Sequence, residues 1–331
     1  MAAKDFATIP KSQKEAISSY GSDVTYETRE IPAVKILNSR GEYSMSMGVL
    51  PPWWRPIARR LPWYRQGVQD VKALAGIAIM AVAKRLATPT DRNDLLSKLQ
   101  AGKDEAVSLS TVCAIQSEML LQGNLMGREE LTAEALTLLI AGSDTTSKHV
   151  HHPFRCAVLI HTSSTCAIIY HLARTPEAQA KLHKELDENL NENIVTIEQV
   201  KNLPYLDACI NEGLRIHSTS ALGLPRVVPP GGLSVLGQKF PEGTILSVPS
   251  YTIHRDTAIW GDDVENFRPE RWFERDQGDI QKTFNPFSFG PRACVGRNLA
   301  FLELQIIVGS ILRQYSFVLE DPHQPVRLVS L

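Results

Sequence analysis

The chain has 331 residues, a formal net charge of −1 and a hydrophobic content of 43%. This length fits one large domain or two ordinary ones, and the near-zero charge argues against nucleic acid as a partner, since nucleic-acid-binding domains are usually basic. The five cysteines form neither a Cys-x-x-Cys pair nor an even-numbered framework, so we expect reduced thiols in a cytosol-facing protein.

The N-terminal part of the chain, residues 1–48, is weakly periodic and predicts no defined element. It has neither the apolar core of a signal peptide nor a run long enough to span a bilayer, so no transmembrane segment is expected. Residues 51–65 combine three tryptophans with four arginines, which suits a membrane–water interface and equally a loop that caps a helix. Apolar periodicity then predicts a helix over residues 69–86 and a short one over 94–99.

Residues 129–146 predict a buried helix that runs into the hexapeptide Ala-Gly-Ser-Asp-Thr-Thr. Gly142 costs about 1 kcal/mol relative to alanine in a helix, and threonine hydroxyls can bond back to a carbonyl one turn earlier. Such a local defect would open a groove for a small ligand beside Asp144 and Thr145. The alternative is an ordinary helix C-terminus.

Residues 148–163 interrupt this helical pattern, because Pro153 inside a helix would cost about 3 kcal/mol or more. A cluster of possible metal ligands lies here, namely His149, His151, His152 and Cys156. No second ligand pair follows at the spacing of a zinc site, so we do not expect a bound metal ion in this segment.

Three longer helices are predicted next, over residues 164–174, 176–190 and 204–217. Thr175 is the expected N-cap of the second, ahead of Pro176, and Thr196 opens a short helix before the third. Within the third helix, Glu212 and Arg215 are three residues apart and therefore share one face. Such a pair is weak evidence alone, since any surface helix can show it.

Short β-branched runs separated by turn residues predict a small antiparallel sheet, over residues 224–228, 233–236 and 244–248. A long irregular segment follows, from His254 towards the cysteine-containing stretch 286–297.

Cys294 lies in that stretch among glycines, phenylalanines and arginines. Nearby cations favour the thiolate over the thiol, and Gly290 and Gly296 allow a large group to approach the backbone. A largely buried helix is predicted to begin near Cys294 or Val295, with amides that stabilise a negative sulfur. The alternative is a buried structural cysteine.

The spacing of Phe287, Gly290, Arg292, Cys294 and Gly296 resembles the haem-binding loop of the cytochrome P450 family, the haem-thiolate monooxygenases. The resemblance implies a mainly α fold with small antiparallel β-sheets. It also implies that these five residues bind haem b and that Cys294 is the axial ligand of its iron.

The same resemblance assigns roles to residues outside the loop. Arg226 and Arg292 would each contact a haem propionate, and Asp144 and Thr145 would relay protons to bound dioxygen. Arg271, in the stretch Phe-Arg-Pro-Glu-Arg-Trp, would complete a structural network that fixes the cysteine loop, and the other members of that network would be Glu212 and Arg215. Buried charges are costly unless paired, so the three would form together.

Three stretches resemble more narrowly the fungal benzoate para-hydroxylases, namely residues 224–229, 247–256 and 271–277. This likeness implies conversion of benzoate to 4-hydroxybenzoate with O2, using electrons from NADPH delivered by NADPH–cytochrome P450 reductase. The family's location would be the cytosolic face of the endoplasmic reticulum membrane. The alternatives are a pisatin demethylase-like enzyme acting on another aromatic substrate, or a non-catalytic fragment.

We therefore expect residues 1–331 to form a single, incomplete cytochrome P450 domain that is truncated at its N-terminus. Residues 106–124 and 148–163 interrupt the family pattern, and we interpret them as foreign insertions that derive from retained introns.

Overall fold

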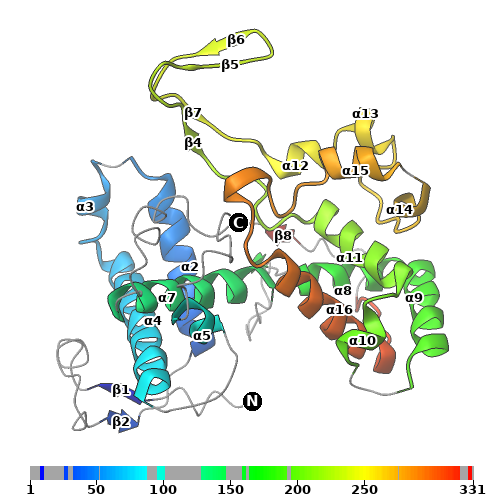
Figure 1. Cartoon of the computed structure of the whole chain (residues 1–331), viewed down its shortest axis with the longest axis horizontal. Helices are drawn as coiled ribbons and strands as arrows, with labels where there is room; N and C mark the ends of the chain where they lie inside the picture. Colours follow the sequence, from blue (N-terminus) through cyan, green and yellow to red (C-terminus); the bar gives the residue numbers. More distant parts are fainter. Residues whose placement is uncertain are drawn as a thin grey trace. The chain divides into compact units, whose positions relative to one another are not determined.

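The computed structural model (Figure 1) describes residues 8–10, 26–28, 33–51, 53–87, 95–100, 128–146, 159–161, 164–191, 195–274, 276–320 and 327–329. These residues fall into two compact units, Met1–Asp144 and Thr145–Leu331, and each unit is described by itself. Within the described part of the chain, no helix is both long and apolar enough to cross a bilayer.

The first unit is built mainly from helices. It contains α2 (Ala33–Val49), α3 (Arg55–Ala58), α4 (Pro62–Ala87), α5 (Leu95–Gln100), most of α7 (Arg128–Thr146), and β1 (Thr8–Pro10) paired antiparallel with β2 (Tyr26–Thr28). A small core joins Ile36 of α2 to Leu74 and Ile77 of α4, with Leu136 of α7 packed against it. The helix predicted over residues 69–86 is confirmed within the longer α4, whereas α2 was not predicted.

Helix α7 confirms the helix predicted over residues 129–146. The helix continues through Gly142 without a break, because the cost of one glycine, about 1 kcal/mol, does not interrupt a helix of this length. It ends at Thr146. The predicted local defect is therefore wrong. The prediction of a buried helix holds only in part, since Leu131 is buried whereas Leu139 is 37% exposed.

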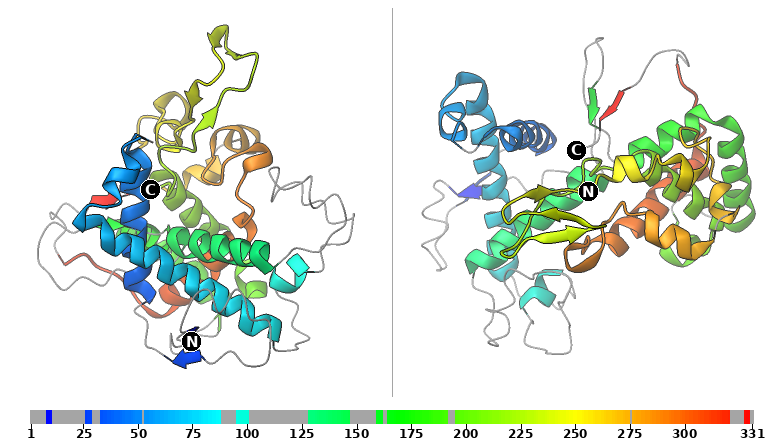
Figure 2. Two further views of the ribbon diagram at one scale, coloured as in Figure 1. Left: turned by 90° about the vertical axis from the view of Figure 1, so that its left-hand side faces the viewer. Right: turned by 90° about the horizontal axis from the view of Figure 1, so that it is seen from above.

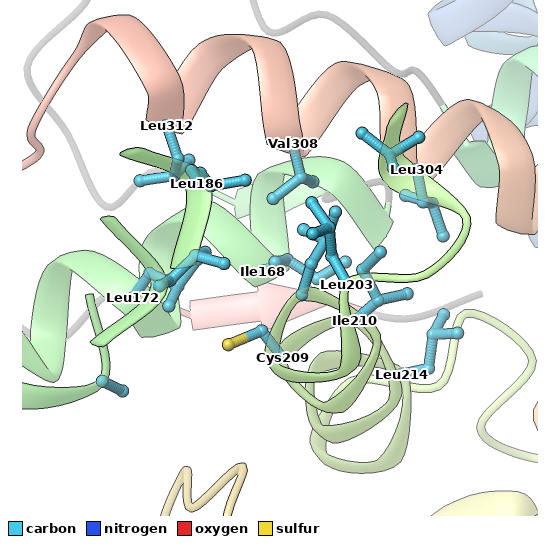
Figure 3. Packing of buried hydrophobic residues seen from close by; sticks show 14 of the residues in the cluster. Ile168, Leu172, Leu186, Leu203, Cys209, Ile210, Leu214, Leu304, Val308 and Leu312 are labelled. Atoms are coloured by element: carbon cyan, nitrogen blue, oxygen red, sulfur yellow. The ribbon is translucent and has the colours of Figure 1, made fainter. Parts of the chain in front are cut away.

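The second unit holds the larger core. Its main helices are α8 (Ser164–Arg174), α9 (Pro176–Asn189), α10 (Ile197–Val200), α11 (Pro204–Ile216) and α16 (Arg297–Gln314). The longer helices turn apolar residues at helical spacing toward one another, as Leu304, Val308 and Leu312 of α16 do (Figure 3). Helices α8 and α11 approach closely at Gly213, where a larger residue would not fit. A Cβ atom at this position would lie only 2.4 Å from Cγ1 of Ile168.

The helix boundaries in this unit follow the predictions closely. Helix α8 has the predicted bounds, and α9 and α11 each end one residue earlier than predicted. Thr196 is the N-cap residue of α10, and its amide donates to Gln199 Oε1 at 2.8 Å, as in a capping box. Thr175 occupies the N-cap position of α9, but its side chain makes no capping hydrogen bond.

The strands of the second unit form separate pairs. Strand β4 (Arg226–Val227) is antiparallel to β7 (Ile245–Leu246), β5 (Leu233–Val235) is antiparallel to β6 (Gln238–Phe240), and β3 (Leu159–His161) is parallel to β8 (Arg327–Val329). Leu236 and Gly237 both have positive φ, 49° and 82°, as a two-residue turn that matches the strand twist requires. The resulting ribbon projects away from the helices of its unit (Figures 1 and 2).

The fold class is thus confirmed as mainly α with small antiparallel sheets. The single sheet predicted from three runs is two separate pairs, and β6 was not predicted. An irregular segment follows β7, with short helices α12 (Ser250–Ile253), α13 (Thr257–Trp260), α14 (Arg271–Glu274) and α15 (Gln277–Thr283). A second apolar cluster in this segment packs Trp260, Trp272 and Ile280 against Ala208 of α11.

Candidate functional site

The loop that carries Cys294 connects α15 to α16 and is held by its own backbone. The amide of Ser288 donates to the carbonyl of Asn285 at 3.0 Å, and the amide of Cys294 donates to the carbonyl of Phe287 at 2.8 Å. Ser288 and Gly290 both have positive φ, 60° and 75°, so the chain turns sharply between these two hydrogen bonds. The loop therefore presents Cys294 from a defined turn, and its thiol is exposed rather than buried.

Helix α16 begins at Arg297, three residues after the cysteine and two after Val295, near the predicted start. The 3₁₀ turn Gly290–Arg292 and the N-cap Gly296 occupy the residues around the cysteine, which delays the start of the helix. The helix is also only partly buried, since Leu299 is 48% exposed while Leu304 is buried.

The surroundings of Cys294 fit a large, flat and partly apolar group. Phe289, Val295 and Leu299 are apolar side chains near the thiol in sequence and are about half exposed. A Cβ atom added at Gly296 would lie 3.9 Å from the Cys294 sulfur, so glycine leaves the space beside the thiol open. Exposed apolar side chains in this stretch of the chain and open space beside the thiol both suit a porphyrin.

Two arginines fit the carboxylates of such a group. The guanidinium of Arg226 is exposed and donates to the carbonyl of Pro225 at 3.0 Å. Arg292 is exposed within the cysteine loop, and neither arginine forms an ion pair with a residue that the structure describes. Both are therefore available to an anionic ligand.

The structure brings Glu212, Arg215 and Arg271 together in one buried network. Nε and Nη2 of Arg215 donate to the two carboxylate oxygens of Glu212, both at 2.9 Å, and Nε of Arg271 donates to Glu212 Oε1 at 2.9 Å. None of the three side chains is exposed to solvent. Burial of this kind is tolerated only because the carboxylate and both guanidinium groups have close partners.

Other residues complete the network and were not predicted from the sequence. Trp272 Nε1 donates to Glu212 Oε2 at 3.1 Å, and Arg271 Nη1 donates to Asp263 Oδ1 at 3.1 Å. Burial alone would raise the pKa of Asp263, but hydrogen bonds from Arg271 and Arg268 outweigh it and hold that pKa below its ordinary value. Asp263 therefore balances the second arginine. No regular spacing relates it to Glu212, so the sequence carried no signal for it.

A further contact connects this network to the cysteine loop. Arg215 Nη1 donates to the carbonyl of His254 at 2.7 Å, and the imidazole Nε2 of His254 accepts from the amide of Asn285 at 3.0 Å. Asn285 is also the residue whose carbonyl closes the first turn of the loop on Ser288. His254 thus forms hydrogen bonds both with the buried Arg215 and with Asn285 at the start of the loop.

The predicted proton-relay pair lies at the end of α7, where the two units divide. The side chain of Asp144 is outside the described residues, and the carbonyl of Thr145 accepts from Ser164 Oγ at 3.2 Å. The relay role of Asp144 and Thr145 stays a prediction.

Several other predictions fall on residues that the structure does not describe. Residues 106–124 lie outside it, as does the cluster of His149, His151, His152 and Cys156. Of residues 148–163, only strand β3 is described. The interpretation of these segments as insertions stays a prediction.

In the first unit, the predicted interfacial stretch 51–65 exposes apolar side chains. Trp53 is 72% exposed and Ile57 is 47% exposed. Arg55 is held by the backbone, because its Nε donates to the carbonyl of Leu50 at 2.9 Å and its Nη2 to that of Gly48 at 3.1 Å.

Comparison with known proteins places this fold and loop in one family. The cytochrome P450 family model matches residues 44–329, and the chain therefore belongs to the cytochrome P450 family. It is similar to benzoate 4-monooxygenase bphA of Aspergillus niger, with 43% identity over 329 residues that cover 96% of this chain and 55% of that protein.

A second relative is more distant. Cytochrome P450 monooxygenase atr2 of Stereocaulon alpinum is 33% identical over 244 residues, which cover 73% of this chain and 42% of that protein. The chain thus spans about half the length of the curated relatives it matches. The cofactor of the family is haem held by a cysteine thiolate, and the loop around Cys294 fits it.

Proposed function

We propose that this chain is part of a haem-dependent monooxygenase that hydroxylates benzoate to 4-hydroxybenzoate. The observation that carries the proposal is the exposed thiol of Cys294, presented on a loop that a buried ion-pair network supports. The substrate comes from the 43% identity to a protein named benzoate 4-monooxygenase. Electrons would come from NADPH through a cytochrome P450 reductase.

Different residues of this chain would bind different parts of the haem. Cys294 would supply a thiolate to the iron, and Phe287, Gly290 and Gly296 would shape the loop around it. Arg226 and Arg292 would pair with the two propionates, since charge-assisted hydrogen bonds to carboxylates are strong. When bound, haem supplies the activation of dioxygen on which ring hydroxylation depends.

The remaining roles concern protons and the substrate. Asp144 and Thr145 would hold a proton at a carboxyl or hydroxyl oxygen and pass it toward the reacting oxygen. An apolar pocket that accepts benzoate needs a cation or several hydrogen-bond donors for the carboxylate, because an unpaired buried charge is costly.

The spectrum of the reduced, carbon-monoxide-bound protein tests the cofactor assignment. We expect a red-shifted Soret band for the wild-type chain reconstituted with haem, and its loss in Cys294→Ser. A wild-type chain that shows no such band would instead support the alternative of a non-catalytic fragment.

Titration with benzoate tests the substrate. Binding next to the iron should shift its spin state, and benzamide, which lacks the negative charge, should bind more weakly. If benzoate leaves the spectrum unchanged while another aromatic compound shifts it, the pisatin demethylase-like alternative replaces benzoate hydroxylation.

The surface formed by residues 51–65 supports a second proposal, that the first unit contacts a membrane at the cytosolic face of the endoplasmic reticulum. Exposed Trp53 and Ile57 would enter the interface, and arginines beside them would meet anionic headgroups. Trp53→Ala with Ile57→Ala should abolish flotation with vesicles containing phosphatidylserine. Val71→Ala, which removes an exposed apolar side chain of α4, should leave flotation unchanged. Equal flotation of the wild type, the double variant and Val71→Ala would contradict the membrane contact.

A further inference from the structure

The chain enters the cysteine loop at Phe284 and Asn285, directly after α15, and this entry point is anchored from another segment. The anchor is His254, at the C-terminal end of α12, whose side chain is fully buried. Its ring accepts the Asn285 amide at 3.0 Å, and its backbone carbonyl accepts Arg215 Nη1 at 2.7 Å. One residue therefore contacts both the ion-pair network and the loop.

From Asn285 the path to the cysteine consists of two further backbone hydrogen bonds. The carbonyl of Asn285 accepts from Ser288, and the carbonyl of Phe287 accepts from Cys294, at 3.0 Å and 2.8 Å. A displacement of Asn285 would shift the first turn of the loop and with it the carbonyl that holds the Cys294 amide. A continuous series of hydrogen bonds therefore leads from the His254 ring to the backbone of Cys294.

The bond requires a neutral imidazole with its lone pair on Nε2. Burial, followed by the charge of Arg215, lowers the pKa of His254 to about 4, so the ring is neutral near physiological pH. With Nε2 as the acceptor, the proton is on Nδ1, which has no hydrogen-bond partner among the residues described. An unpaired buried N–H is unfavourable, and an apolar side chain would avoid it. The benefit that offsets this cost is the acceptor offered to Asn285.

Packing alone does not explain a histidine at this position. The ring lies 5.4 Å from the ring of Phe284 and 6.2 Å from that of Trp260, centroid to centroid. A phenylalanine could fill the same aromatic environment and leave no N–H unpaired. What phenylalanine lacks is a lone pair directed at Asn285.

We propose that His254 is a positioning residue for the thiolate ligand: it fixes the entry to the cysteine loop by accepting the Asn285 amide and ties that loop to Arg215. The consequence for haem ligation rests on the function proposed above, whereas the consequence for the loop itself does not.

Two variants separate the acceptor from the ring. His254→Phe keeps an aromatic ring and removes the lone pair, whereas His254→Gln removes the ring and keeps an oxygen that can accept from Asn285. Amide hydrogen exchange of peptides covering residues 285–294, in the full chain, reports the loop. We expect exchange about tenfold faster in His254→Phe, the effect of losing one neutral hydrogen bond, and near wild-type exchange in His254→Gln.

The same proteins, reconstituted with haem, give a second readout. His254→Phe should lose part of the red-shifted Soret band of the carbon-monoxide complex, and His254→Gln should retain it. Exchange that is unchanged in both variants, or faster in His254→Gln than in His254→Phe, would overturn the proposal in favour of ring packing. A wild-type chain without the Soret band would refute the proposed function, while hydrogen exchange would still decide the role of His254.

Nitrogen-15 NMR of the wild-type histidines covers the case in which His254→Phe does not fold. The proposal requires the Nδ1-protonated tautomer with Nε2 accepting a hydrogen bond from Asn285. A proton found on Nε2 would overturn it without any variant.

Discussion

The side chains of Glu212 and Arg271, 59 residues apart in the chain, meet at 2.9 Å with no exposure to solvent. Because Glu212 also binds Arg215, removing its carboxylate leaves two buried guanidinium groups short of a partner. We therefore expect Glu212→Ala to lower the free energy of unfolding by about 3–5 kcal/mol, as breaking a buried ion pair does, measured by urea denaturation.

An exposed ion pair provides the matched comparison for this prediction. Arg313 Nη1 contacts Asp187 Oδ1 at 2.7 Å, with the Asp187 side chain 58% exposed. Asp187→Ala should cost about 1 kcal/mol or less. Similar losses for Glu212→Ala and Asp187→Ala would contradict a stabilising role specific to the buried network.

Glu185 on α9 caps the N-terminus of α11, the helix that carries Glu212 and Arg215. Its two carboxylate oxygens accept from the amides of Tyr205 and Leu206, both at 2.8 Å, while the N-cap residue itself provides no capping side chain. Glu185→Ala should therefore destabilise the protein by about 1–2 kcal/mol, the effect of losing a helix cap.

The control for Glu185 lies on the same helix. Glu188 is exposed and its carboxylate is 3.9 Å from Lys184 Nζ, so Glu188→Ala removes the same kind of side chain without uncapping α11. Thermal unfolding should show a clear loss for Glu185→Ala alone. Equal shifts in the two variants would mean that the cap contributes nothing beyond surface charge.

The sequence predicted what depends on local pattern. Helix α8 has the predicted bounds because its apolar residues recur at helical spacing and make the helix strongly amphipathic. Cys294 was predicted as a ligand because five residues of its loop occur at a particular spacing. Helix α2 was missed because glycine, serine and asparagine weaken its periodicity, and its packing against α4 is a tertiary effect.

The contacts that support the site could not be predicted in this way. Asp263 lies in an irregular segment, and it meets Arg271 only because of the path that this segment takes in the folded chain. His254 acts through a ring nitrogen and a backbone carbonyl, both directed at residues far away in the chain. Neither residue has a periodic pattern, so only the three-dimensional structure shows its role.

Asp207 makes stability depend on pH. Burial raises its pKa to about 6, although Gln305 Nε2 donates to Asp207 Oδ1 at 2.7 Å and partly offsets the rise. In the unfolded chain an aspartate has a pKa of about 3.9. Between these values the folded state binds more protons than the unfolded state, so this contribution to stability is present at low pH and is lost as the pH rises through about 6.

Asp207→Asn should remove this pH dependence, because asparagine can still accept from Gln305 and carries no charge. We expect the variant to be more stable than wild type at pH 7 by about 1 kcal/mol, a value reduced to allow for partial solvent exposure. The difference should disappear near pH 4 in urea denaturation. A difference of the same size at both pH values would show that Asp207 does not titrate in this window.

Gly290 and Gly142 allow one side chain to be tested in two backbone conformations. A Cβ atom at either position would meet no atom within 4 Å, but only Gly290 has a positive φ, 75°. Alanine in that left-handed conformation costs about 1–2 kcal/mol, whereas alanine in place of glycine within helix α7 should stabilise by about 1 kcal/mol.

Gly290→Ala should therefore destabilise the chain and weaken haem retention, and Gly142→Ala should raise the unfolding temperature. Gly290→Asn should lie between wild type and Gly290→Ala, since asparagine tolerates this conformation. If Gly290→Ala and Gly142→Ala shifted the unfolding temperature in the same direction, the positive φ of Gly290 would not be required for the conformation of the cysteine loop.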